Sequence, residues 1–345
     1  MSTAVITGGS GFFGSILKLQ LLNSGWQCIS IDLLPDETVH PSLRVVQGDL
    51  RDREIAASLF DGRPVDAVFH CAALLAHAVD DERLLWSSNV DGTRVLADAS
   101  AQNGVGTMVF VSSNCLWGRG VGHTVSEDEP PEPFEIYGRS KLEAEQLLSG
   151  YRDRMKVVVL RSPTIVDSGR LGLLTILFEF IADGKRVWTV GDGSNRYQFV
   201  YAPDLADACL RSVEFGRSAT FNIGSDDVPT LRDAYEFVIA RAGTTARLAR
   251  LPRRTTMLAM RLANRMGISP LGPYHYRMIA EDFVFDTSKA KRELGWRPTL
   301  TNGEMLWQAY QYYVEQRDSP ADRSQVSPHR QAAEMGVIRL LKLIS

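Results

Sequence analysis

Tyr137 and Lys141 are the residues of this sequence whose types and spacing most directly suggest chemistry. They stand one helical turn apart in Tyr-Gly-Arg-Ser-Lys, so on a helix both side chains would share a face. A phenol keeps its proton to about pH 10, and a nearby ammonium stabilises the phenolate and lowers that value. The pair is therefore suited to exchange a proton with a substrate hydroxyl near neutral pH. Because Tyr-x-x-x-Lys also occurs by chance, its meaning depends on the elements around it.

A glycine-rich turn near the N-terminus is the second such feature. Gly8, Gly11 and Gly14 recur every third residue between an apolar strand-like segment and a helical pattern. Glycine there permits a tight turn, close approach of a pyrophosphate and packing of helix on strand, with the phosphates at the helix N-terminus. A glycine-rich turn without a ligand is the alternative. We predict a dinucleotide site with contacts from Gly8, Ser10, Gly11, Phe12, Phe13 and Gly14.

Asp32 and Asp49 are the acidic residues predicted to meet the adenosine end of that dinucleotide. Asp32 ends a predicted strand, where it would accept hydrogen bonds from the ribose hydroxyls and repel the extra phosphate of NADP. No basic residue directly follows Asp32, so NAD is the predicted cofactor. Each carboxylate has a simpler alternative, since Asp32 could cap a turn and Asp49 the helix that follows.

The elements that must position these residues alternate along the first half of the chain. Helical patterns, notably 83–102 and 140–149, lie between short apolar segments. Such alternation is typical of an α/β protein, and predicts a Rossmann-type doubly wound parallel sheet. The predicted strands are 4–7, 27–32, 44–47, 67–70, 107–111 and 156–160.

After Arg161 the pattern is less regular and predicts a smaller C-terminal α/β substrate domain. Helices are expected at 171–182, 202–212 and 231–242, and a polar loop at 191–196. Segments 199–200 and 221–223 could return to the sheet. The predicted division is an NAD-binding domain at 1–165 with return segments near 199–225, a mostly substrate-binding domain at 166–315, and a tail at 316–345. The apolar end of the tail, 337–344, is expected to be a frayed terminus, with an interaction helix as the alternative.

Composition narrows the function classes. The 345 residues carry a net charge of −3, so no basic excess indicates nucleic acid, and no apolar stretch is long enough for a membrane span. The N-terminus lacks the pattern of a signal peptide. The four cysteines are far apart and predict reduced thiols in a cytoplasmic protein. No His/Cys cluster has metal-ligand spacing, so no metal is predicted.

Several further motifs stand in a consistent order along the chain. They are His70-Cys71-Ala72-Ala73, Asn89-Val90-Asp91-Gly92-Thr93, Val111-Ser112-Ser113, Tyr137-x-x-x-Lys141, Phe285-Asp286-Thr287-Ser288-Lys289-Ala290 and Glu293-Leu294-Gly295-Trp296. With the glycine turn and Gly48-Asp49-Leu50, they resemble the extended short-chain dehydrogenase/reductase family, the NAD-dependent nucleotide-sugar epimerases and dehydratases. The resemblance runs from Thr3 to about Leu300.

The resemblance implies a role for each catalytic residue. Ser113 would hydrogen-bond the reacting substrate oxygen while Tyr137 moves the proton, and Lys141 would bind the nicotinamide ribose. Ser112 is the less favoured partner of Tyr137, and Ser113 could instead only cap the next loop. Further cofactor contacts implied by the resemblance are Leu50, Cys71, Ala72, Ala73 and Pro163.

The chain departs from this family at the residues after Ser113. The family's 4,6-dehydratases have Asp-Glu where this chain has Asn114-Cys115, which disfavours that reaction. In the family's 3,5-epimerases a cysteine at this place removes a proton beside a ketone, but those enzymes need a basic partner, and Arg170, the nearest candidate here, stays charged. Cys115 is therefore either such a base or a small packing residue.

Departures also affect the substrate side. Thr164 stands where many relatives have an asparagine that contacts the pyrophosphate. Tyr197 takes the place of the family's arginine, with Arg196 one residue earlier. The predicted substrate contacts are Asn114, Thr164 and Arg196.

The predicted function is epimerisation of a nucleotide sugar, at C4, through a transient ketone. One alternative is a net dehydrogenase or reductase of a sugar, sterol-like or other alcohol, since Leu74, Leu75 and Trp117 are apolar near the expected substrate. A 3,5-epimerase using Cys115 and a non-catalytic NAD-binding regulator are further alternatives. By family resemblance, helices 83–102 and 140–149 would form a homodimer.

Overall fold

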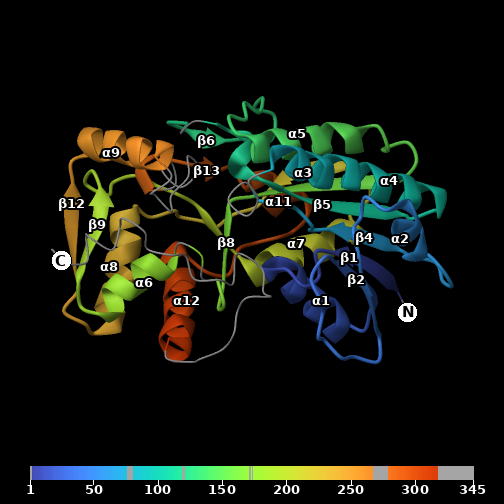
Figure 1. The fold of residues 1–345 in the computed structure, drawn as a ribbon, viewed down its shortest axis with the longest axis horizontal. Coiled ribbons are helices and arrows are strands. Elements are labelled where there is room, and N and C mark those ends of the chain that lie inside the picture. Colours follow the sequence, from blue (N-terminus) through green and yellow to red (C-terminus); the bar gives the residue numbers. More distant parts are fainter. Residues whose placement is uncertain are drawn as a thin grey trace.

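The computed structural model describes residues 2–75, 81–118, 121–170, 172, 174–266 and 279–317 (Figure 1). Its centre is a seven-stranded parallel sheet with the order β11-β7-β5-β4-β1-β2-β3. All six strands predicted in the first half lie in this sheet, and so does the return segment around Phe221. The strands are β1 (Thr3–Thr7), β2 (Gln27–Asp32), β3 (Leu43–Gln47), β4 (Ala67–His70), β5 (Thr107–Ser113), β7 (Lys156–Ser162) and β11 (Ala219–Asn222).

Helices cover both faces of the sheet, which confirms the doubly wound arrangement (Figure 1). One face packs on α1 (Phe12–Asn23), α7 (Ala202–Glu214) and α11 (Ser288–Glu293), and the other on α2 (Arg53–Ser58), α4 (Gly92–Gln102) and α5 (Ile136–Ser149). Adjacent residues of β4 show the alternation. Phe69 packs into the first of these cores and Val68 into the second, and both are fully buried. A strand buried on both faces has a nearly continuous apolar sequence, as Ala67–Phe69 of β4 does.

The rest of the described chain forms a second region around small two-stranded parallel sheets. Their strands are β8 (Thr164–Val166) with β10 (Phe199–Tyr201), β9 (Arg186–Val190) with β12 (Arg247–Leu251), and β6 (Thr124–Val125) with β13 (Val284–Phe285). The helices of this region are α6 (Leu174–Ala182), α8 (Leu231–Ala242), α9 (Arg253–Arg265) and α12 (Asn302–Gln316). An aromatic core joins them, with Phe178 edge-on to Tyr310 and Phe283 edge-on to Phe285.

Two sequence expectations about elements need correction. Residues 199–200 do not return to the central sheet, because β10 pairs in parallel with β8 instead. The helix expected at 83–102 is interrupted, since α3 (Glu82–Trp86) and α4 are joined by a π-helical turn, η1 (Ser87–Asp91). A short 3₁₀ turn, η2 (Asn114–Leu116), follows β5. The tail beyond Arg317 lies outside the described residues.

Two kinds of feature are absent from the described residues. None of the helices described is long and apolar enough to cross a membrane. No group of three or more His, Cys, Asp or Glu side chains in this part of the chain could hold a metal ion.

Candidate active site

The glycine-rich turn joins β1 to α1 through contacts that a side chain would block. Gly8 has a φ of +72°, and a Cβ on it would lie 2.9 Å from Ala72 Cα. A Cβ on Gly14 would lie 2.0 Å from the carbonyl oxygen of Gly8. The turn, the start of α1 and the segment after β4 are therefore packed backbone against backbone, and Gly8 and Ala72, both predicted cofactor contacts, lie side by side.

The N-terminus of α1 has the features of a phosphate site. Gly11 at the N-cap has no side chain with which to cap the helix, and the first turn contains no acidic residue. The first-turn amides and the positive end of the helix dipole favour an anion there. Phe12 and Phe13, which were predicted to contact the cofactor, bury their rings in the core, so what they offer a phosphate is their backbone.

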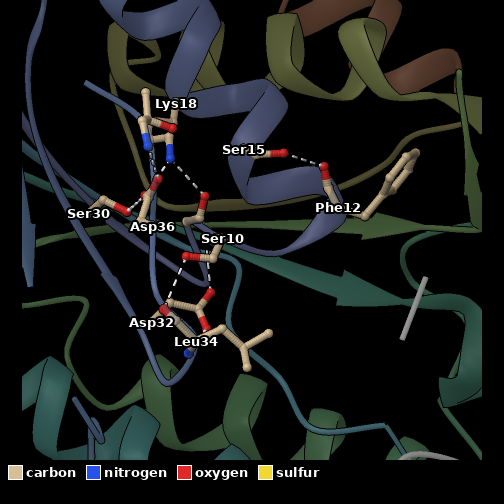
Figure 2. Close-up of polar contacts among 10 residues, drawn as sticks. Ser10, Phe12, Ser15, Lys18, Ser30, Asp32, Leu34 and Asp36 are labelled. Atoms are coloured by element: carbon tan, nitrogen blue, oxygen red, sulfur yellow. Dashed lines mark hydrogen bonds and ion pairs between the residues drawn. The ribbon is translucent and has the colours of Figure 1, made fainter. Parts of the chain in front are cut away.

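Asp32 lies at the end of β2 beside this turn. Its carboxylate accepts a hydrogen bond from the Ser10 amide at 3.0 Å and another from the Leu34 amide at 3.0 Å (Figure 2). The Ser10 hydroxyl donates to the Leu34 carbonyl at 3.3 Å. Asp32 thus caps a turn, which was the simpler of the two predicted roles. A carboxylate has about four acceptor positions, so two remain for ribose hydroxyls, and the glycine turn together with Asp32 fits a dinucleotide.

Asp49 does not cap the helix that follows it, which corrects one expectation. The N-cap of α2 is Asp52, whose carboxylate accepts from the amides of Glu54 and Ile55. Asp49 instead binds the Arg51 guanidinium through two hydrogen bonds of 3.0 Å to Nε and an ion pair of 2.5 Å to a terminal nitrogen. The hydrogen bonds from Arg51 hold the pKa of the Asp49 carboxyl below its ordinary value. A contact between Asp49 or Leu50 and the adenine stays a prediction.

Helix α5 places Tyr137 and Lys141 on one face, next to the end of β5. A Cβ on Gly138 would lie 2.2 Å from the Cys115 carbonyl oxygen, so only glycine lets α5 approach η2 this closely. That approach brings the Tyr137 hydroxyl close enough to Ser113 for the serine side chain to favour the phenolate. The Ser113 hydroxyl also accepts from the Cys115 amide at 3.1 Å, so it both caps the turn and meets Tyr137. Ser112, the less favoured partner, has a buried hydroxyl with no hydrogen-bond partner in the described chain.

Lys141 is buried, with its ammonium 4.3 Å from the centre of the Phe110 ring. Burial lowers the pKa of Lys141 to about 8, against the opposing effect of nearby acidic groups such as Glu145. The pKa of Tyr137 is raised, not lowered as expected from Lys141. Burial of the hydroxyl is the main cause, with Cys115 next, and the hydrogen bond from Ser113 opposes it. Desolvation of the phenol therefore outweighs the stabilisation of the phenolate in this arrangement.

A buried polar network beneath the site gives His70 and Thr93 a role that the sequence motifs did not specify. The Thr93 hydroxyl donates to the Asn89 carbonyl at 2.6 Å, so His70 Nε2 must donate to Thr93 at 2.8 Å. His70 Nδ1 then accepts from the Thr7 hydroxyl at 2.7 Å, and that hydroxyl accepts from the Ala72 amide at 3.2 Å. Burial lowers the pKa of His70 to about 3, so the ring is neutral.

Asn89 extends this network to the catalytic helix. Its amide nitrogen donates to the Leu74 carbonyl and to the Ser140 hydroxyl, both at 3.0 Å, and its amide oxygen accepts from the Leu74 amide at 2.8 Å. Asn89 lies in the π-helical turn η1, a feature that often marks functional sites. The Ser140 hydroxyl in turn donates to the Tyr137 carbonyl at 2.8 Å. Hydrogen-bonded side chains thus connect the ends of β1 and β4 with helix α5.

Asn114 faces the second region of the molecule. Its amide nitrogen donates to the Tyr197 hydroxyl at 2.7 Å, and both side chains are buried. Tyr197 also offers its carbonyl to Asn302, at 2.8 Å, so α12 is connected to η2 through Tyr197. Cys115, beside Asn114, is buried and not disulfide-bonded.

The remaining predicted substrate and cofactor residues lie at separate places in the structure. Pro163 is buried between β7 and β8, and Thr164 begins β8 opposite Phe199. Arg196 is exposed, and its backbone amide binds the Asp282 carboxylate at 2.7 Å. Arg170, the notable cation near Tyr137, has its guanidinium 5.6 Å from the centre of the Phe12 ring.

Comparison with known families agrees with this geometry. Residues 4–224 match the model of the NAD dependent epimerase/dehydratase family. The chain belongs to this family. It is an enzyme family that uses NAD, and the chain is a member of the extended short-chain dehydrogenases/reductases. The glycine turn and Asp32 are the residues that would hold NAD.

Individual relatives of this epimerase/dehydratase family member span most of its length. A Sinorhizobium fredii protein named Uncharacterized protein y4nG is 37% identical over 92% of this chain and 80% of its own. A UDP-glucose 4-epimerase of Neisseria meningitidis is 26% identical over 90% and 97%. A 3 beta-hydroxysteroid dehydrogenase/Delta 5-->4-isomerase of Mycobacterium tuberculosis is 28% identical over 91% of each chain. The solved UDP-glucose 4-epimerase of Thermotoga maritima, with UDP-glucose, shares the fold with a TM-score of 0.76, at 24% identity over 92% of this chain and all of its own.

Proposed function

We propose that this protein is an NAD-dependent epimerase of a nucleotide sugar and acts at C4. The observation that carries the proposal is the close approach of α5 to the end of β5, which brings Tyr137 beside Ser113, with Lys141 one turn further along the same helix face. Three side chains from β5 and α5 thus converge beside the segment after β4 and the glycine turn. This is the constellation needed for proton exchange at a carbinol oxygen next to a dinucleotide.

In the proposed reaction Tyr137, as the phenolate, takes the proton of the sugar 4-hydroxyl and returns it at the end of the cycle. Ser113 hydrogen-bonds the same oxygen while it changes from alcohol to ketone. When bound, NAD supplies the hydride transfer at the carbon. Burial lowers the pKa of Lys141 to about 8, so its ammonium is more easily deprotonated than that of an exposed lysine. Protonated, it stabilises the phenolate of Tyr137 once the proton has left.

Asn114 supports epimerisation over dehydration. An elimination needs an acid and a base at the carbons next to the ketone. Asn114 is a neutral amide, and its nitrogen is held by the Tyr197 hydroxyl. The residue therefore supplies no proton transfer.

The finer assignments belong to the same proposal. Thr164 and Arg196, with Asn114, would contact the diphosphate sugar, and the substrate-binding domain would occupy most of 166–315. Helices 83–102 and 140–149, which lie on the same outer face of the sheet, would form a homodimer (Figure 1). The absence of disulfides among the four cysteines is compatible with a cytoplasmic protein.

A panel assay tests the proposal. The purified protein is incubated with UDP-, dTDP- and GDP-linked hexoses, uronic acids and N-acetylhexosamines without added NAD, and products are identified by NMR. We expect interconversion of one C4-epimeric pair by cofactor that the protein retains. No interconversion anywhere on the panel would reject the proposal.

The relative named as a 3 beta-hydroxysteroid dehydrogenase/isomerase supports a second candidate, net oxidation of an alcohol. Of the three apolar residues that suggested it, Trp117 is buried against Phe283 and Phe285, while Leu74 and Leu75 keep partial exposure. Stoichiometric formation of NADH with a hydroxysteroid or a free sugar would establish this activity. Turnover without added NAD would count against it.

A further inference from the structure

A buried ion pair lies beside the glycine-rich turn (Figure 2). Lys18 of α1 and Asp36, in the loop after β2, have side chains that are only 1% and 4% exposed. The Lys18 ammonium donates to the Asp36 carboxylate and, at 3.1 Å, to the carbonyl oxygen of Gly9. Lysine is rarely buried, and a buried charge is costly unless it is paired and hydrogen-bonded. The pair therefore holds its place through specific contacts.

Asp36 connects the loop to the rest of the site. Its carboxylate also accepts from the Ser30 hydroxyl of β2 at 2.9 Å and from the Thr38 amide at 3.1 Å. Burial alone would raise the pKa of Asp36, but the hydrogen bonds from Lys18, Thr38 and Ser30 hold it below its ordinary value. The carboxylate is thus charged and fully engaged, with partners on a helix, a strand and its own loop.

The loop is consequently fastened to the glycine turn at two points. At its start, Asp32 accepts from the Ser10 amide, and the Ser10 hydroxyl donates to Leu34. Four residues further along, Asp36 reaches the carbonyl of Gly9 through Lys18. Gly9 also packs closely against β2, because a Cβ on Gly9 would lie 2.0 Å from the Ser30 hydroxyl oxygen. Both fastenings bear on the loop that carries Asp32, the acceptor for the adenosine ribose.

We propose that Lys18 and Asp36 are positioning residues for the adenosine end of NAD. The pair fixes residues 33–38 against the glycine turn, and so keeps the Asp32 carboxylate at the place where its free acceptor positions meet the ribose. Neither residue touches the cofactor. Because the Lys18 ammonium is paired with Asp36 and hydrogen-bonded to Gly9, its charge is not presented to the 2′-phosphate of NADP.

The test measures the affinity of the full-length, cofactor-stripped protein for NAD and for ADP-ribose by calorimetry. Lys18→Met keeps the volume and removes the charge. We expect its dissociation constants for NAD and ADP-ribose to rise by about tenfold or more, and by the same factor, because both ligands contain the adenosine half. Arg217→Met, which breaks the exposed ion pair with Glu293 in the same half of the molecule, is the matched control and should leave both constants unchanged.

The double variant Lys18→Met/Asp36→Asn separates positioning from mere structural support, and decides the matter if the single variant does not fold. With no uncompensated charge left, its melting temperature should return towards that of the parent. Its affinity for NAD should stay reduced about tenfold, since the loop is no longer fastened. Recovery of affinity together with stability would overturn the proposal. So would unchanged NAD binding in Lys18→Met, or a loss for NAD without one for ADP-ribose.

Discussion

The central-sheet region and the small-sheet region are held together in different ways. In the central sheet, the residues of the site lie at the ends of parallel strands, and their positions follow from backbone contacts such as that between Gly8 and Ala72. In the small-sheet region, strands of two to five residues are joined by an aromatic core that includes Phe178, Tyr197 and Phe283. Backbone packing therefore positions the predicted cofactor contacts. Side-chain packing shapes the region that we propose to bind the substrate.

The largest expected effect is the loss of kcat on substitution of Tyr137. Tyr137→Phe removes the proton-transferring hydroxyl and should lower kcat by about 10³-fold, within the range for loss of a general acid–base. Retained NAD, measured by absorbance after denaturation, should be unchanged. Tyr151→Phe, whose lost hydroxyl donates to Asp98 at 2.7 Å away from the site, is the matched control. Full activity of Tyr137→Phe would favour the non-catalytic alternative.

A methyl group on the glycine turn should affect the cofactor side alone. Gly14→Ala places a Cβ against the Gly8 carbonyl oxygen, and overpacking of this kind costs about 1–3 kcal/mol. We expect a lower melting temperature and loss of retained NAD. Gly216→Ala is the matched control, because a Cβ there meets nothing within 4 Å. Equal behaviour of the two variants would show that the turn is not packed as described.

Loss of the hydrogen bond between Asn114 and Tyr197, which links the two regions, should have a smaller effect on activity. Tyr197→Phe removes the hydroxyl that accepts from Asn114 and leaves a buried amide donor short of that partner, at a cost of about 1–3 kcal/mol. We expect kcat/KM for the sugar nucleotide to fall about tenfold and retained NAD to stay constant. Tyr201→Phe, also in the small-sheet region, is the control. A loss of NAD in Tyr197→Phe would mean that the small-sheet region also fixes the cofactor.

Lys141 should leave a signature in the pH dependence of stability. Its folded pKa of about 8 lies below the ordinary 10.5. Between these values the unfolded chain binds the proton and the folded chain does not, so this group's contribution to stability rises as pH increases from about 8 to 10.5 and is constant below. Lys141→Met should abolish that rise, as seen in denaturant titrations of cofactor-free protein at pH 7, 8.5 and 10. An unchanged rise would assign it to other groups.

The smallest effect is expected at Cys115. A C4-epimerase has no proton to remove beside the ketone, so Cys115→Ala should change kcat by less than about threefold, the ordinary consequence of a small change in packing. Cys209→Ala, a buried cysteine of the central-sheet region, is the comparison. A loss of a hundredfold or more at Cys115 alone would revive the 3,5-epimerase alternative.

The same contrast explains what the sequence could predict. The central sheet, its order of helices and the glycine turn follow from local patterns, because strand periodicity and glycine spacing report directly on backbone geometry. Asn89 and His70 were visible as motifs, yet their roles depend on a π-helical turn and on tautomers that only the packed structure shows. Lys18 and Asp36 gave no signal, since their pairing joins a helix to a distant loop. The raised pKa of Tyr137 likewise depends on burial, which spacing does not reveal.

The fate of the hydrogen at C4 tests the proposed epimerisation most directly. The protein is given a nucleotide hexose deuterated at C4, without added NAD, and the product is examined by NMR and mass spectrometry. We expect the C4 epimer with its deuterium retained at C4, because the same hydrogen leaves and returns within one active site. Epimer that has lost the deuterium to solvent, or oxidised product with stoichiometric NADH, would contradict the proposal.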